Sequence, residues 1–139
     1  MKTAIKTATK TVTKTFALKV TLIASLVLPA TALAGQAEID QIERAASVLN
    51  TQKLTQLSQE FNGYDKALGL YRLGLSHNLT GNQDAAKTAM KEAMNTLEEL
   101  SESQPENAEV KALLAQVYGL SVALEPLKAP YYGIKSGQV

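Results

Sequence analysis

The sequence predicts an all-α fold in which antiparallel helix pairs, joined by short turns, stack into a short α-solenoid or bundle. Apolar residues recur at a spacing of three or four from about residue 38 onward, which is the period of an amphipathic helix. No segment of useful length alternates between apolar and polar residues as a half-buried strand does. Turn-forming Gly, Asn and Pro residues separate the periodic segments. The 139-residue chain contains no cysteine, so packing alone must hold this fold.

The first 34 residues have the three parts of a secretory signal peptide. Lysines recur every four residues from Lys2 to Lys14, an apolar run covers 20–28, and Ala32-Leu33-Ala34 gives a small-residue cleavage site before Gly35. The apolar run is shorter than the roughly 20 residues that span a bilayer. We therefore expect cleavage after Ala34 and a periplasmic or secreted protein, with an uncleaved anchor or a basic arm as the alternative.

Cleavage would also change the charge of the protein. The signal carries five of the fourteen basic residues and none of the thirteen acidic ones, so residues 35–139 have a net charge of −4. A mildly acidic exported chain has no electrostatic basis for binding nucleic acid, and we expect none. We also expect no stable membrane insertion after cleavage. The expected partner is another exported protein or a second copy of the chain.

The helical domain is predicted over 35–126 in three parts. A degenerate helix pair covers 38–61 and ends at Asn62-Gly63, a stronger pair covers 67–100, and a further helix covers 106–124. We expect Pro105 to open this last helix, because proline tolerates the first helical turn, and Glu125-Pro126 to close it. The remaining tail, 127–139, is predicted to be a loop or a frayed end.

The second helix pair resembles a tetratricopeptide repeat. Its segment contains Leu70, the pair Leu73-Gly74, Gly81, Ala86 and Ala93 at the positions of the family's large residue, Leu-Gly pair, turn glycine and two small alanines. The resemblance implies that Gly74, Ala86 and Ala93 allow the two helices to approach closely. A fainter match places Tyr118-Gly119 at the position of Leu73-Gly74. Met90 and His77 depart from the family pattern, which has aromatic residues there.

The same resemblance implies where a partner would bind. In tetratricopeptide proteins a peptide lies along the concave face made by the first helix of each pair. Carried over by position, this face is mostly apolar, with polar groups that could bond a peptide backbone. Its residues here would be Leu68, Tyr71, Leu75 and Asn78 from one helix and Leu113, Gln116, Leu120 and Ala123 from the other.

The helix over 106–124 is apolar around most of its circumference, which is typical of a helix buried on all sides. It is nevertheless the last predicted helix, and a terminal repeat normally presents a polar outer face. The outer face of this helix could be buried in three ways: by the tail folding back through Tyr131 and Tyr132, by a second subunit, or by a partner protein.

The sequence does not favour catalysis, and we expect no enzyme, no cofactor and no metal site. His77 is the only histidine, and no nucleophile or phosphate motif accompanies it. Five glutamates between Glu98 and Glu109 lack the order of a calcium loop and are expected to form a solvated helix end. The leading prediction is a non-catalytic exported interaction module. The alternatives are a small carboxylate-dependent hydrolase, using Glu98 and Glu102, and a membrane-tethered structural protein with an uncleaved signal.

Overall fold

The computed structural model describes the backbone of residues 30–139 and the side chains from Gly35 onward. Within these residues every regular element is a helix, which confirms the predicted all-α class. The helices are α1 (Ala30–Ser47), α2 (Thr51–Glu60), α3 (Gly63–Leu79), α4 (Gln83–Ser103), α5 (Ala108–Leu124), the 3₁₀ turn η1 (Pro126–Lys128) and α6 (Ala129–Gln138). The signal-peptide prediction falls almost entirely outside the described residues.

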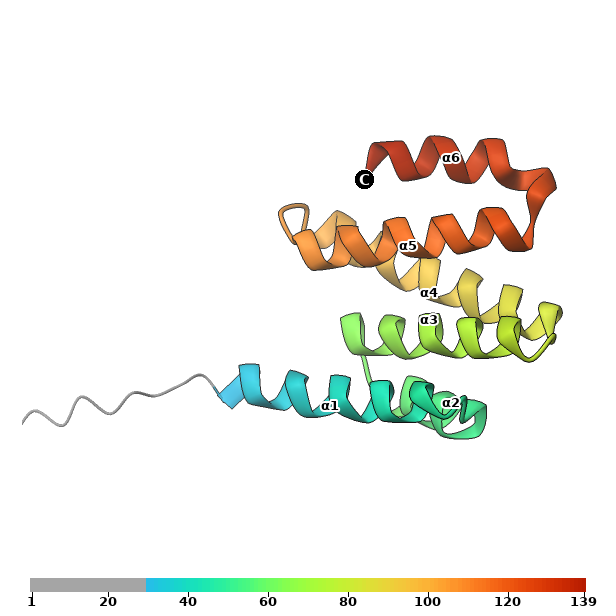
Figure 1. Ribbon diagram of the computed structural model, residues 1–139. Helices are drawn as coiled ribbons and strands as arrows, with labels where there is room; N and C mark the ends of the chain where they lie inside the picture. The colour runs from blue at the N-terminus through green and yellow to red at the C-terminus, as the bar shows by residue number, and fades with distance from the viewer. Residues whose placement is uncertain (1–29) are drawn as a thin grey trace, which may run out of the picture.

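The helices stack in chain order, from α1 and α2 at one end to α6 at the other (Figure 1). α3 and α4 share the most extensive contact, α1 and α2 both pack on α3, and α5 lies between α4 and α6. The contact between α3 and α5 is slight by comparison. From α2 onward each helix packs mainly on its neighbours in sequence, as in a stacked set of helical hairpins, whereas α1 packs more on α3 than on α2.

Asparagine is the N-cap residue of α2, α3, α4 and α5, and in all of these but α3 its side chain caps the helix. The side-chain oxygen of Asn50 accepts a hydrogen bond from the backbone N–H of Lys53 at 2.9 Å, and that of Asn82 accepts one from Ala85 at 3.3 Å. Asn107 accepts from two backbone N–H groups of α5. Each bond satisfies a donor that the first helical turn leaves free. The prediction that Pro105 opens α5 is thus wrong, because Asn107 is the capping residue and Pro105 lies in the preceding turn.

The predicted close approach of α3 and α4 is confirmed at Gly74. A Cβ atom on this residue would lie 2.1 Å from the Met90 methyl carbon, far inside contact distance. Ala86 and Ala93, both fully buried, line the same helix pair. Gly81 has a φ of 81°, a conformation that glycine adopts without strain, and it forms the turn into α4. Gly119 differs, because a Cβ there would meet nothing within 4 Å.

The core runs through the whole stack as one cluster. Its large, fully buried members come from α1, α2, α4 and α5 and are mainly aliphatic, with one methionine and one tyrosine. They are Ile42, Leu54, Leu57, Met90, Leu97, Val110, Val117 and Tyr118. None of the helices over 30–139 has the length and apolarity required to cross a membrane.

The tail is the main departure from the sequence prediction. Residues 127–139 were expected to be a loop or frayed end, but all of them except Val139 belong to η1 and α6, and α6 packs along α5. Tyr132 is buried, and its ring lies 6.4 Å from that of Tyr118. Of the three covers left open for α5, the structure shows the tail folding back. Tyr131 takes no part in this cover, since 54% of its surface remains exposed.

Candidate functional site

The eight residues predicted to lie on the binding face belong to α3 and α5, but their exposure differs, and the last of them, Ala123, is exposed. Leu68 and Leu113 are buried in the core, so they support the fold rather than present a surface. Tyr71, Leu75, Asn78 and Leu120 are half-buried, and Gln116 is exposed. The Asn78 side chain already accepts a hydrogen bond from Gln83 at 2.9 Å.

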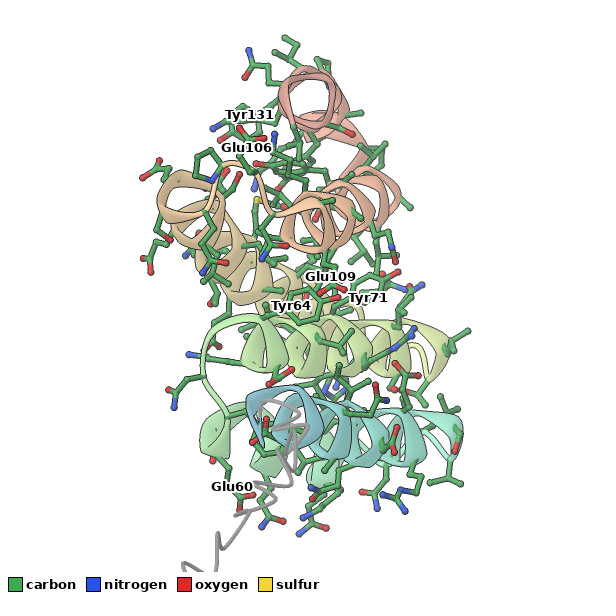
Figure 2. All side chains as sticks on the ribbon, turned by 90° about the vertical axis from the view of Figure 1, so that its left-hand side faces the viewer. Glu60, Tyr64, Tyr71, Glu106, Glu109 and Tyr131 are labelled. Carbon is green, nitrogen blue, oxygen red and sulfur yellow. The ribbon has the colours of Figure 1, made fainter. Side chains whose placement is uncertain are left out.

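The region between α3 and α5 contains two tyrosines and an acidic residue. Figure 2 shows Tyr64 of α3 close to Glu109 of α5, and Tyr71 lies further along the same helix. Burial raises the pKa of Tyr64, and the nearby Glu109 carboxylate raises it further. The Arg72 guanidinium lies 5.6 Å from the centre of the Tyr71 ring and pairs with Glu43 of α1 at 2.7 Å. Tyr64 was not among the predicted partner-binding residues, although its seven-residue spacing from Tyr71 places it on the same side of the helix.

A cavity of about 250 Å³ lies between α1 and α3. Its apolar lining includes Ala46, Leu49, Leu75 and Leu79, and the Arg72–Glu43 ion pair closes one side. Leu79 is 70% exposed, and Val48, which precedes Leu49 in the turn after α1, is 71% exposed. We call Val48, Leu49, Leu75 and Leu79 the α1–α3 apolar patch. It contains one of the predicted partner-binding residues, Leu75.

Two tyrosine–glutamate hydrogen bonds connect α5 with its neighbours, one with α4 and the other with α6. The Tyr118 hydroxyl donates to Glu98 of α4 at 2.5 Å, and the Tyr132 hydroxyl donates to Glu125 at 2.6 Å. Burial and the adjacent carboxylate raise the pKa of both tyrosines, that of Tyr132 to about 12. Lys128 also binds Glu125, at 2.7 Å, and these two partners lower the pKa of that carboxyl. Both carboxylates therefore have internal partners.

Glu98 and Glu102, the carboxylates considered for hydrolysis, line one cavity of about 240 Å³, and His77 is not among the residues that line it. His77 is half-buried in the last turn of α3, where its backbone oxygen accepts from Asn82. Glu98 is bound by Tyr118 and lies 3.5 Å from Lys135, whereas Glu102 is exposed. Among the described side chains, no group of three or more acidic, histidine or cysteine residues could hold a metal ion.

A larger cleft of about 340 Å³ separates α4 from η1 and α6, with α5 behind it. We call it the α4–α6 cleft. Met90, Met94 and Leu124 supply its apolar side and are all buried. Lys87 and Lys91 line it from α4, and Tyr131 and Tyr132 line it from α6. Figure 2 shows Tyr131 on the side of α6 that faces α4. Sequence periodicity identified α4 as amphipathic but gave no sign of this cleft, because α6 was not expected to exist.

Comparisons with protein-family models, with characterised proteins and with solved structures give no significant match, so the chain's own geometry must carry any assignment of function.

Proposed function

We infer that this protein is an exported, non-catalytic interaction module of the tetratricopeptide-like class, which binds a segment of another exported protein. Support for the class comes from the close approach at Gly74, the turn at Gly81 and the buried alanines of α4. Gly119 makes no such approach, so α5 and α6 form a looser pair than α3 and α4 do.

The observation that carries the binding role is the α1–α3 apolar patch. Large exposed apolar side chains gathered around a cavity are typical of a surface that contacts another molecule. This patch continues the side of α3 that presents Leu75, with Tyr71 and Asn78 following on the same helix. An apolar side chain of the partner would enter the α1–α3 cavity. The rest of the segment would then run toward Gln116 and Leu120 of α5.

Photo-crosslinking in the exporting cell tests this proposal. A photoreactive amino acid at Leu79 or Gln116 should yield a covalent adduct with a second polypeptide. The same group at Gln56 on α2, which is also exposed, should not. A Val48→Ser substitution should reduce the Leu79 adduct without affecting thermal stability. Adducts of equal yield from all three positions, or from none, would contradict a partner surface on α1, α3 and α5.

Export is tested separately by mass spectrometry of the protein recovered from outside the cytoplasm. An N-terminus at Gly35 is the expected result. A chain that retains Met1 and sediments with the membrane would favour the membrane-tethered alternative.

Self-association is the second candidate, and a different surface favours it. Leu127 is 99% exposed and Ile134 is 66% exposed on the outer side of η1 and α6. Light scattering after size exclusion should give a concentration-independent dimer if this side is covered by a second copy. Leu127→Ser should then shift the mass to that of a monomer. A monomer at every concentration excludes this candidate and leaves the partner-segment role in place.

A further inference from the structure

The α4–α6 cleft combines an apolar floor with a lysine-lined wall. Met90, Met94 and Leu124 are buried at its base. Methionine side chains adapt to differently shaped apolar groups because they are unbranched and flexible. The cleft volume of about 340 Å³ falls within the range of about 300–1,000 Å³ that is common for binding sites.

The acidic residues at this cleft are already neutralised. Glu98 accepts the Tyr118 hydroxyl and lies 3.5 Å from Lys135, and Glu125 binds both Lys128 and Tyr132. A carboxylate with two internal donors has little capacity left for a cationic ligand. These two glutamates therefore contribute structure to α6 rather than a negative field in the cleft.

The lysines of α4 are less committed. Lys87 lies 3.7 Å from Asp84, whose side chain is 99% exposed, and such an exposed pair is worth little. Lys91 makes no ion pair with any of the residues from 35 to 139 whose side chains are described. Lysines four residues apart share one side of a helix and repel each other. Two lysine charges, one in a weak ion pair and one in none, therefore line the cleft, although residues 35–139 are acidic overall.

We propose that the α4–α6 cleft binds an acidic amphipathic peptide segment, whose apolar side chain lies against Met90 and Met94 and whose carboxylates bind Lys87 and Lys91. Tyr131 would contact the same segment from the α6 side, where its ring is half exposed. Charge complementarity selects this occupant, because the lysines attract carboxylates while the buried floor requires an apolar group. The cleft shares no lining residue with the α1–α3 apolar patch, so this second site is independent of the first.

Methionine-methyl NMR on the full protein provides a specific test. The chain has three methionines, Met1 and the two at the cleft floor, so isotope labelling at these methyls reports on the cleft directly. The probe is a short synthetic peptide with Leu and Glu at helical spacing. Matched peptides replace Glu with Lys, or Leu with Ser. We expect the first peptide alone to shift the Met90 and Met94 signals, with an affinity that falls as salt is added.

The protein variants identify the charges. Lys87→Gln combined with Lys91→Gln should weaken binding about tenfold, because two charge-assisted contacts are lost. Lys53→Gln on α2, outside the cleft, is the matched control and should leave the affinity within about twofold, as a distant screened charge should. All three lysines lie at the surface, and unchanged circular dichroism will confirm that the variants are folded.

Several results would overturn the proposal. The first is that saturating peptide leaves the Met90 and Met94 signals unshifted. The second is that the double variant binds the peptide as tightly as the wild-type protein does. The third is that the Ser-containing peptide binds as tightly as the Leu-containing one, which would show that the cleft acts only as a charged surface. Vesicles of phosphatidylglycerol and phosphatidylcholine serve as a further comparison. Lysine-dependent binding to these vesicles without binding to the peptide would assign the lysines to a lipid surface instead. None of these outcomes bears on the crosslinks expected at Leu79 and Gln116.

Discussion

The close approach of α3 and α4 makes an unusual prediction about Gly74→Ala. Replacing a mid-helix glycine with alanine normally stabilises a helix by about 0.8–1.0 kcal/mol. Here the new Cβ would lie 2.1 Å from the Met90 methyl carbon and 3.4 Å from the Ala86 backbone oxygen. Met90 is 1% exposed and also lines the α4–α6 cleft, so its methyl group must leave its present packing to avoid the new Cβ. Overpacking of this kind costs roughly 1–3 kcal/mol, so we expect a net loss of about 1 kcal/mol.

A second background should reverse the sign of this effect. In a Met90→Ala protein, which is itself destabilised by about 2–5 kcal/mol, the clashing methyl group is gone. Gly74→Ala should then stabilise by about 0.5–1 kcal/mol through helix propensity alone. Gly119→Ala is the matched control, because its Cβ would meet nothing within 4 Å. It should stabilise by about the same 0.5–1 kcal/mol in either background.

Urea denaturation of the four proteins of this cycle and of the Gly119 control gives the required free energies of unfolding. The coupling between Gly74→Ala and Met90→Ala should be about 1–3 kcal/mol, as is found for residues in contact. If Gly74→Ala stabilises the wild-type protein as much as Gly119→Ala does, α3 and α4 do not approach closely at this position. The resemblance to a tetratricopeptide repeat would then lose its main physical support.

Three further predictions concern the core, the α1–α3 contact and α6. Ala86→Leu should lower the free energy of unfolding by about 1–3 kcal/mol through overpacking, and unchanged thermal stability would contradict the tight crossing. Burial and a hydrogen bond with Glu38 raise the pKa of Asp65 to about 6, so its contribution to stability is present below its unfolded pKa near 4 and falls as pH rises to about 6. Because Asp65 is half exposed, we expect this change in the free energy of unfolding to be only about 1 kcal/mol. Asp65→Asn should remove the pH dependence and leave the protein more stable at pH 7. A variant that is less stable than the wild type at pH 7 would refute the assignment. Tyr132→Ala should release α6 and lower the free energy of unfolding by about 2–4 kcal/mol. The amides of 129–138 should then exchange hydrogen quickly while those of α3 and α4 stay protected. Fast exchange throughout the chain would instead show that α6 is needed for the whole fold.

The fold class, the approximate extent of the helix pairs and the α3–α4 crossing could be predicted from the sequence alone. These properties depend on short-range signals: helical periodicity, turn residues such as Gly81, and small residues at a helix contact. The role of Gly74 was predicted through the resemblance to the tetratricopeptide pattern, whereas Gly119, the fainter match, makes no close approach. The exposure of the predicted binding residues could not be read from the sequence. The helical pattern does not distinguish Leu68 and Leu113, which are buried, from Leu120, which is half-buried.

The packing of α6 on α5 could be seen only in the tertiary structure. The α6 segment contains Pro130, Gly133 and Gly137, all poor helix formers, so local propensity predicts a loop. Contact with α5 overrides that preference, because burying Tyr132 against Tyr118 and satisfying Glu125 stabilise the helix from outside. The α4–α6 cleft exists only because α6 folds there, and its lysines and methionines lie far from Tyr132 in sequence. A site assembled by a long-range contact leaves no local signal for sequence analysis to find.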